Sequence, residues 1–332
     1  MNILLTLDYE LFFGRRTGSV ESSIVAPTDA LLKLTGPRRI PLVFFVDVAY
    51  IAALRREMHK DAQLRKDHDL ICRHIEMLAK QGHEIQLHIH SHWEDCHWAG
   101  DGWNMDTRRY KLHDFDAADI SRLVTSYVAI LKDLAGPEHA FAFRAGGWVI
   151  QPFSKLKQAL LAAGIRIDST VFPGGTAEDA AHDFDFRAAP QVGHWRFDSD
   201  PCKPEATGPF LEVPIASLKV HPSFYWRFAL HKKFGGSASK AYGNGNAIGP
   251  GRTDTLKKLL TRTSTVASMD GYKSTLLEKG YKNYINAGAT EYCIIGHPKA
   301  LSPFSLGRLD RFLTPERTKQ VVGYTQYLSA LG

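Results

Sequence analysis

Short apolar runs alternate with longer amphipathic stretches along most of this chain, and this alternation limits the folds open to it. The runs Ile3–Leu7 and Leu42–Val46 predict strands, whereas the apolar spacing over Leu70–Gln81 predicts a helix that ends at Gly82. Further strands are expected at Glu84–His88, Ala140–Phe143, Ile165–Ile167, Phe210–Pro214 and Tyr292–Ile295, and further helices at Ala118–Leu134, Phe153–Ala163 and Pro315–Leu331. Alternating strands and helices predict an α/β protein with a mostly parallel sheet, open or closed into a barrel.

Polar residues stand at or just after the carboxyl ends of these predicted strands. They are Asp8, Glu10, His88, His92, Arg144, Asp168 and His297. In parallel α/β proteins, and in barrels above all, active sites form at that end of the sheet. The sequence therefore predicts one catalytic layer built from several strands.

Composition places the chain among ordinary globular proteins. It has 332 residues, 44% hydrophobic, with 41 Lys and Arg against 35 Asp and Glu, a formal net charge of +6. The length suits one large barrel-type domain or two smaller ones. Basic residues occur as isolated pairs such as Arg38-Arg39 and Lys232-Lys233, which favours no nucleic-acid partner, although the net charge suits anionic sugars or nucleotides.

The cellular compartment is predicted from the cysteines and the apolar runs. The four cysteines are scattered without a C-x-x-C motif, which fits reduced thiols better than a secreted disulfide framework. No apolar run approaches the roughly 18 residues that a spanning helix needs. The first residues enter a strand at once, without the features of a leader. We therefore expect a cytoplasmic protein that does not span a membrane.

Three histidines within the five residues His88 to His92 are the strongest sign of chemistry. A buried imidazole needs partners for both ring nitrogens, so a cluster of this kind is difficult to explain by packing. His88 and His92 are four residues apart and would share a face on a helical turn, whereas His88 and His90 would share a face on a strand. The sequence allows either pair to bind a metal ion.

Asp8 and Glu10 flank Tyr9 at the end of the first strand, so both carboxylates point to the same side. One can ligate a divalent metal while the other removes a proton from water. Arg144 can hold a carboxylate with two hydrogen bonds, and Gly146-Gly147 allows backbone N–H groups to approach an oxyanion. Asp168 and His297 are expected to form a carboxylate–imidazole pair.

Residues 174–290 differ from the rest because they are rich in glycine and aromatic residues. The segment Tyr242–Gly251 is expected to be a loop. The segment His221–Leu230 contains three aromatic residues and a Trp-Arg pair, which favours a patch covering the barrel over a lid or a sugar-stacking surface.

Taken in order, these segments resemble the NodB-homology polysaccharide deacetylases, carbohydrate esterase family 4. The resemblance is carried by Thr6–Glu10, Gly82–His92, Phe143–Gly146, Asp168–Pro173 and His297–Phe304. Within that family the chain looks most similar to WbmS-type deacetylases of O-antigen and other surface-polysaccharide biosynthesis. The resemblance implies a single deacetylase domain over residues 1–332, a distorted (β/α) barrel with a loop-rich insertion at about 174–290.

The resemblance also implies a role for each site residue. Glu10, His88 and His92 are the metal ligands, Asp8 is the general base and His297 is the general acid. Asp168 tunes His297 and Arg144 orients Asp8. Arg144 is followed by Ala-Gly-Gly-Trp rather than by the family's Pro-rich segment, so the oxyanion donor is either Gly147 or Trp148.

The function expected from the sequence is metal-dependent N-deacetylation of an N-acetylated sugar, nucleotide-linked or part of an oligosaccharide. Zn²⁺ is the favoured ion for two histidines and a carboxylate, and other first-row ions also suit them. Two alternatives stay open. One is an amidohydrolase-type hydrolase that uses His88 and His90, and the other is a non-catalytic carbohydrate-binding protein of the same fold.

Overall fold

The computed structural model describes residues 1–331 apart from 15, 180, 192 and 247–251, and it describes only the backbone of 252–254. Its main sheet has eight strands, namely β1 (Asn2–Tyr9), β2 (Val43–Asp47), β3 (Glu84–Ile89), β6 (Ala142–Ala145), β7 (Ile167–Asp168), β10 (Trp195–Phe197), β11 (Phe210–Glu212) and β14 (Glu291–Gly296). Three two-stranded sheets accompany it: β4 (His97–Trp98) with β5 (Trp103–Asn104), β8 (Thr176–Glu178) with β9 (Asp183–Asp185), and β12 (Ser217–Val220) with β13 (Thr263–Val266).

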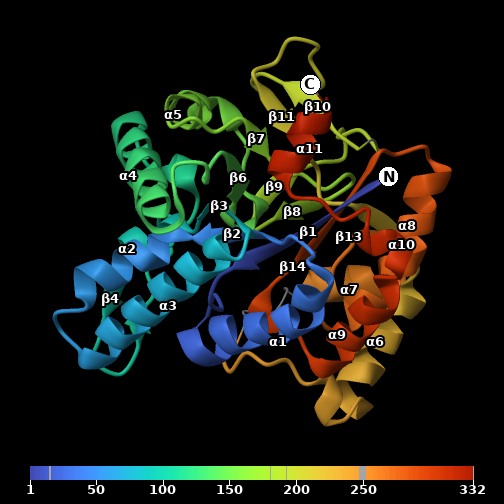
Figure 1. Cartoon of the computed structure of the whole chain (residues 1–332), viewed down its shortest axis with the longest axis horizontal. Helices are drawn as coiled ribbons and strands as arrows, with labels where there is room; N and C mark the ends of the chain where they lie inside the picture. The colour runs from blue at the N-terminus through green and yellow to red at the C-terminus, as the bar shows by residue number, and fades with distance from the viewer. Residues whose placement is uncertain (15, 180, 192, 247–251, 332) are drawn as a thin grey trace.

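Helices surround the main sheet (Figure 1). They are α1 (Ala26–Thr35), α2 (Val48–Glu57), α3 (Ala62–Lys80), α4 (Ala117–Ala135), α5 (Lys157–Ala162), α6 (Pro222–Phe234), α7 (Arg252–Leu260), α8 (Leu277–Asn286), α9 (Pro303–Phe312), α10 (Pro315–Thr318) and α11 (Tyr324–Leu331). Among the described residues, no helix is both long enough and apolar enough to cross a bilayer.

The main sheet is curled and rich in parallel pairs, with the strand order β10-β11-β7-β6-β3-β2-β1-β14. Every neighbouring pair in it is parallel except β10 with β11. The expected α/β class is therefore confirmed. The distorted (β/α) barrel implied by the resemblance is seen as a curled half-barrel, because the edge strands β10 and β14 do not pair with each other in the described chain.

A segment without regular structure spans the open side of the sheet at its carboxyl end. Val213 N–H donates to Asp168 O at 2.9 Å, Ile215 N–H donates to Val171 O at 2.8 Å, and Ala216 N–H donates to Cys293 O at 2.8 Å. These hydrogen bonds connect the β7 side of the sheet to β14, so the strand ends still enclose a common space.

The strands and helices form for simple reasons. The central strands are buried along nearly their whole length, as expected for parallel strands covered on both faces. Helix α3 buries one face that includes Leu64, Ile71 and Ile75, and the Asp61 side chain caps it by accepting from Gln63 N–H. It begins eight residues before the predicted helix, because that N-cap lies upstream of the strong apolar pattern.

The predicted helix Pro315–Leu331 is wrong as a single element. Thr314 caps a short helix, α10, as its sequence suggests, but the chain then runs alongside β1 before α11 begins. Ile3 N–H donates to Gln320 O at 2.8 Å, and Val322 N–H donates to Ile3 O at 3.0 Å. Pairing with the first strand thus overrides local helix propensity.

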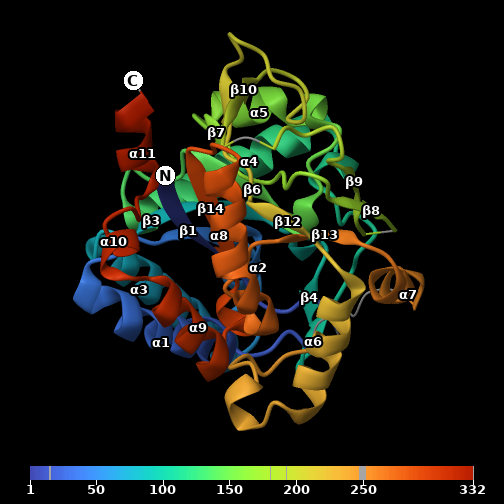
Figure 2. The same cartoon turned by 90° about the vertical axis from the view of Figure 1, so that its right-hand side faces the viewer.

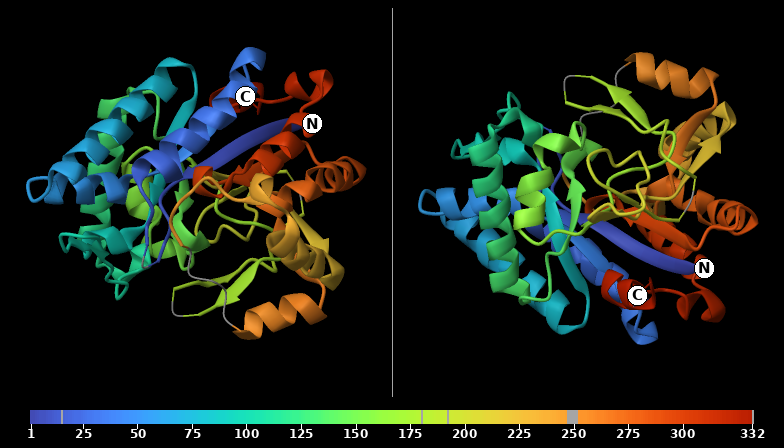
Figure 3. Two further views of the ribbon diagram at one scale, coloured as in Figure 1. Left: turned by 90° about the horizontal axis from the view of Figure 1, so that it is seen from below. Right: turned by 90° about the horizontal axis from the view of Figure 1, so that it is seen from above.

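The segment 174–290 contains more regular structure than a loop-rich insertion. It supplies β10 and β11 to the main sheet, and it adds the β8–β9 and β12–β13 pairs and the helices α6 to α8 (Figures 2 and 3). The aromatic segment expected as a patch or a lid is helix α6. The expected loop Tyr242–Gly251 lies partly outside the described residues, since 247–251 are not described.

Candidate active site

Beside a second candidate group made of Asp8, Glu10 and His297, the residues Glu10, His88 and His90 form a compact cluster of candidate metal ligands in the described chain. One ligand atom from each lies within 4.8 Å of the others, and all three residues are buried. Nε2 of His88 lies 3.3 Å from Oε2 of Glu10, and Nε2 of His90 contacts the same oxygen. Glu10 directly follows β1, His88 lies in β3, and His90 directly follows β3. The carboxyl ends of nearby strands thus converge, as parallel topology requires.

His90, rather than the expected His92, lies beside Glu10. Strand β3 runs through Ile89, and His90 keeps φ −102° and ψ 89°, so the alternation of an extended chain continues past His88. Residues two apart on such a backbone share a face. The pairing of His88 with His92 would need a helical turn to begin at His88, but the turn begins only at Ser91.

His92 instead occupies an aromatic cage. Its ring stacks on Tyr110 at a centroid distance of 5.5 Å, and Phe13 and Trp93 lie at 5.1 Å. Neither of its ring nitrogens has a hydrogen-bond partner among the described groups. Burial, together with the nearby His90 and Lys299, holds the pKa of His92 well below its usual value. A neutral imidazole packed in this way is a core side chain in this structure.

The electrostatics of the cluster favour a bound cation. Burial opposes the charged form of His88, but Asp8, Glu10 and Asp47 outweigh it and raise the pKa of His88 to about 9. Burial also disfavours ionised Glu10, yet Lys299 and the two histidines lower its pKa well below the usual value. The fold therefore favours an ionised Glu10, and the carboxylates of Asp8, Glu10 and Asp47 place negative charge around His88.

The donor set also fits a divalent ion. Nδ1 of His88 donates to Arg144 O at 2.8 Å, so the lone pair of a neutral His88 lies on Nε2, which faces Glu10. Asp47 accepts from His90 N–H at 3.2 Å and from Trp93 Nε1 at 2.9 Å, which fixes the backbone that presents His90. Two imidazoles and one carboxylate, with groups behind them that set their orientation, form a ligand set that Zn²⁺ accepts.

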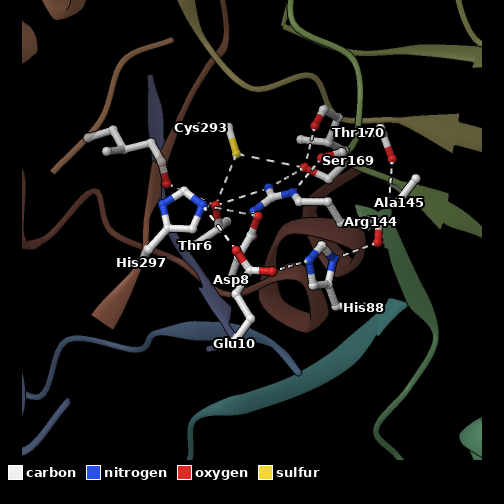
Figure 4. Close-up of polar contacts among 12 residues, drawn as sticks. Thr6, Asp8, Glu10, His88, Arg144, Ala145, Ser169, Thr170, Cys293 and His297 are labelled. Carbon is white, nitrogen blue, oxygen red and sulfur yellow. Dashed lines mark hydrogen bonds and ion pairs between the residues drawn. The ribbon is translucent and has the colours of Figure 1, made fainter. Parts of the chain in front are cut away.

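Asp8 is held by a fully buried arginine. Nη1 of Arg144 donates to Oδ1 of Asp8 at 2.6 Å, and Nη2 donates to Thr6 Oγ1 at 3.0 Å (Figure 4). Nε and Nη2 of Arg144 also donate to the carbonyl and hydroxyl oxygens of Ser169, and the guanidinium stacks 4.1 Å from the Phe45 ring. These contacts fix one oxygen of Asp8 and leave Oδ2 facing His297.

His297 pairs with Asp270 and not with the expected Asp168. Nδ1 of His297 lies 2.7 Å from Oδ2 of Asp270, and the His297 N–H donates to Oδ1 at 2.8 Å. Nε2 lies 3.7 Å from Asp8 Oδ2 and 3.7 Å from Glu10 Oε1. Burial opposes the imidazolium, but Asp270 and then Asp8 and Glu10 outweigh it, so the pKa of His297 is raised.

Asp168 is turned away from this site. Its two oxygens accept from the backbone N–H and the hydroxyl of Thr170, at 3.0 and 2.8 Å. It lies opposite Glu212 on the neighbouring strand, where burial and the Asp168 carboxylate raise the pKa of Glu212 well above its usual value. The structure thus does not bring Asp168 to His297, and it places Asp168 in a separate pair of buried acids with Glu212.

Two glycines allow β6 to approach the cluster closely. A Cβ at Gly146 would lie 2.5 Å from Ile89 O and 2.8 Å from His90 Nδ1. Gly147 has φ +61°, and a Cβ there would meet Tyr110 Oη at 2.7 Å. The expected oxyanion donors Gly147 and Trp148 both line the cleft described next, so the structure brings them to the same side as Glu10 and His88.

A cleft of about 1630 Å³ opens over these residues. We define its floor as the five residues Asp8, Glu10, His88, His90 and His297, all of which line it. Aromatic side chains also line the cleft, among them Tyr110, Trp148 and Phe172. Its far side is formed by residues of β12, β13, α6 and α7. His92, Arg144 and Asp168 do not line it in the described structure.

Three site residues were missed by the sequence analysis. Asp270 precedes a short turn inside the glycine-rich segment, 27 positions from its partner, and carries no local motif. Lys299 donates to Glu10 Oε1 at 2.8 Å, and its position two residues after His297 was a usable signal. Asp47 ends β2 in register with His88, so its place at a strand end was also a signal.

No family model and no curated protein matches this chain. Two deacetylases are among the solved structures that resemble it. The chain has 14% identity and a TM-score of 0.48 to a protein assigned as a polysaccharide deacetylase from Mycobacterium smegmatis, covering 92% of this chain and 77% of that one. It has 15% identity and a TM-score of 0.32 to the Bc1960 peptidoglycan N-acetylglucosamine deacetylase, covering 53% of this chain and 61% of that one. Both scores are below 0.5, so neither likeness decides the activity of this chain.

Proposed function

We propose that this protein is a metal-dependent hydrolase that removes the acetyl group from an N-acetylated sugar. The observation that carries the proposal is the floor of the cleft. A carboxylate and two imidazoles converge there, beside an arginine-held Asp8 and an aspartate-held His297. Hydrolysis of an unactivated amide needs a base for water, an acid for the leaving nitrogen and stabilisation of the oxyanion. The floor offers candidates for the base and the acid within one layer.

Glu10, His88 and His90 are the residues that would hold the ion, with His90 in place of the expected His92. A divalent ion at such a site supplies Lewis acidity, which polarises an amide carbonyl and lowers the pKa of water. We favour Zn²⁺ because two histidines and one carboxylate are common zinc ligands.

The residues of the chain would then divide the proton transfers between them. Asp8 accepts the proton of the attacking water through Oδ2, because Arg144 occupies Oδ1. His297 donates from Nε2 to the departing nitrogen while Asp270 holds its Nδ1–H. The backbone of Gly147 or Trp148 faces the developing oxyanion. Acetate and the free amino sugar are the products.

The cleft supports a sugar as the substrate. Trp148 and, to a smaller extent, the buried Tyr110 line the cleft together with the floor, and sugar rings commonly pack their apolar faces against aromatic rings. The resemblance of the sequence motifs to NodB-homology deacetylases points the same way. A role in O-antigen assembly remains a prediction from the sequence. We place the reaction in the cytoplasm because all four cysteines are free and buried.

The second candidate is an amidohydrolase-type activity on another amide. The specific observation in its favour is that His88 and His90, an H-x-H pair on a strand, share Glu10. Sites of that type add further histidine, aspartate or lysine ligands from later strands. Among the described residues, the later strand ends contribute only His297 and Lys299 to the neighbourhood of Glu10.

Metal analysis combined with a substrate panel tests the proposal. The purified protein should contain close to one divalent ion per chain and release acetate from an acetamido sugar. The matched variant Asp8→Asn should keep the metal while kcat falls by about 10²–10⁴, the usual contribution of a general base. Acetate release that survives Asp8→Asn, or hydrolysis confined to amides without a sugar, would overturn the proposal.

A further inference from the structure

The far side of the cleft carries a group of positive charges that the proposed chemistry does not use. We define the cationic wall as six side chains that line the cleft: Lys219, Lys232, Lys257, Lys258, Arg262 and Lys273. They come from β12, α6, α7, the segment after α7 and the turn after Asp270. Segments far apart in the sequence therefore present charge of one sign to a single space.

None of these six cations has a carboxylate within 4.0 Å among the side chains that the structure describes. The two other cations that line the cleft do have one: Arg187 pairs with Asp185, and Lys299 pairs with Glu10. Most lysines and arginines on an ordinary surface are simply solvated, but these six face a shared concavity. Low-dielectric walls around such a concavity focus the positive potential and attract anions.

Lys273 and Lys258 show that the charges act on one another. Burial, together with the positive charge of Lys258, lowers the pKa of Lys273, although Asp270 partly opposes this. The carboxylate of Asp270 is already engaged by His297. The two positive charges repel each other when the cleft is empty. An anion bound between them would relieve this repulsion, so the pair favours anion binding.

Negative charge in the cleft is concentrated elsewhere. The acidic residues that line it are Asp8 and Glu10 on the floor and Asp179 near β8. Asp179 is engaged with the backbone and side chain of His182. Among the described side chains, the cleft is thus divided into a floor with carboxylates and histidines and a wall whose charged groups are cations.

We propose that the cationic wall binds the phosphoryl or diphosphoryl group of an acetamido sugar that is linked through phosphate, and so selects activated over free sugars. The proposal rests on the proposed deacetylase function and specifies its substrate class. Six cations exceed what a single carboxylate needs, whereas a diphosphate carries at least two charges spread over several oxygens. Lysine ammonium groups suit phosphate as point charges without a required angle.

A binding experiment tests the wall without depending on turnover. Binding of inorganic pyrophosphate and of uridine diphosphate to the metal-loaded protein is measured by calorimetry. The triple variant K257Q/K258Q/R262Q removes three wall charges and leaves the floor intact. The control K80Q/K203Q/K282Q removes three exposed charges elsewhere. We expect the wall variant to bind roughly ten-fold or more weakly, the loss that follows from removing one charge-assisted contact, and the control to bind like wild type.

A kinetic experiment tests selection of the substrate. KM for UDP-N-acetylglucosamine should rise in the wall variant with kcat nearly unchanged, whereas kinetics with free N-acetylglucosamine should not respond. The proposal is overturned if the wall variant binds both diphosphates as tightly as wild type, or if the control weakens binding equally. A different outcome is possible: the wall variant loses diphosphate binding, but neither wild type nor any variant releases acetate. That result would contradict the deacetylase function, while the wall would still be an anion-binding site.

Two sources of the phosphate are separated by the same panel. If the substrate is nucleotide-linked, a nucleotide sugar should bind more tightly than inorganic pyrophosphate, because its base makes additional contacts. A lipid-linked diphosphate sugar, offered in detergent micelles, should gain affinity from its chain. The second source is included because α6 turns Trp226, Leu230 and Phe234 to solvent, spaced four residues apart on one face. Preference for either source supports the wall as the phosphate site.

Discussion

The floor and the cationic wall of the cleft hold their charges in opposite ways. On the floor, each charged or titratable group has partners: Arg144 holds Asp8, Asp270 holds His297, and Lys299 holds Glu10. On the wall, six cations stand without a carboxylate partner among the described side chains. The floor is built from strand ends and adjoining turns, and most of it is buried, whereas most of the wall is exposed and lies on α6, α7 and β12.

This difference suits the floor to the chemical reaction and the wall to recognition of the substrate. A group that must transfer a proton needs a fixed position before substrate arrives, and the hydrogen bonds on the floor supply that position. A group that recognises a charged part of the substrate needs only an unpaired charge that the ligand can neutralise. Substitutions on the floor should therefore change kcat, metal content or stability, whereas substitutions on the wall should change KM.

The largest effect is expected where the metal is held. His90→Ala should leave the purified protein with almost no metal and no measurable activity, because it removes one of three converging ligands. The matched variant His92→Phe should keep the metal, because His92 lies in an aromatic cage. Metal content after dialysis measures both. Retention of metal by His90→Ala together with its loss from His92→Phe would restore the ligand set first expected from the sequence.

A stability contrast between the two regions should also be large. Arg144→Met leaves the buried Asp8 carboxylate without its partner, and breaking a buried pair in this way costs about 3–5 kcal/mol. Lys257→Gln on the wall removes a charge that has no carboxylate partner among the described side chains and should change stability by no more than about 0.5 kcal/mol. Urea denaturation midpoints measure both variants. Equal losses of unfolding free energy in the two variants would mean that Lys257 contributes as much to stability as Arg144 and would contradict this contrast.

The sequence predicted the floor well wherever the residues follow a strand. The ends of β1, β3 and β14 were located from apolar runs, and parallel topology alone brings Asp8, Glu10, His88 and His297 together. The choice between His90 and His92 could not be made from spacing. It depends on whether the chain stays extended for one residue beyond β3, and the hydrogen bond from His90 N–H to Asp47 contributes to that.

The partner of His297 illustrates what local patterns cannot contain. Asp168 has the position expected of a site residue, at the end of β7, but that strand directs its carboxylate toward Thr170 and Glu212. Asp270 lies in a segment without a strong pattern, and it reaches the site because residues 267–269 run beside β14. The wall was equally hidden, because its cations are isolated in sequence and meet only in the folded chain.

The contrast between the two aspartates gives a smaller and sharper test of the floor. Asp270→Asn should lower kcat. A general acid contributes a factor of about 10²–10⁴ to the rate, and the loss should be smaller than this because His297 itself stays in place. Metal content should not change. Asp168→Asn should leave kcat near wild type, since Asp168 does not contact His297. Steady-state kinetics on both would reverse the assignment if Asp168→Asn were the slower enzyme.

The smallest effect concerns the pH dependence of stability at the Asp168–Glu212 pair, which lies in the strand-end layer away from the cleft. Burial and the facing carboxylate raise the pKa of Glu212 above its unfolded value of about 4.3. The folded protein then keeps a proton that the unfolded chain releases, so stability falls as pH rises from the unfolded pKa toward the folded one. The fall is at most about 1.4 kcal/mol per pH unit.

Glu212→Gln has no proton to lose and can still accept from Val171 N–H, as Oε1 of Glu212 does at 3.2 Å. The variant should therefore lose less stability than wild type between pH 5 and pH 8, although the two should be similar near the acidic end. The exposed Glu205→Gln serves as the control and should follow wild type throughout. Thermal melts across this pH range measure the difference. Parallel curves for wild type and Glu212→Gln would mean that Glu212 is ionised in the fold and that the pair holds no shared proton. The Asp168–Glu212 pair would then carry ionised carboxylates in the folded protein, as the floor does at Asp8 and Glu10, and the two parts of the strand-end layer would not differ in this respect.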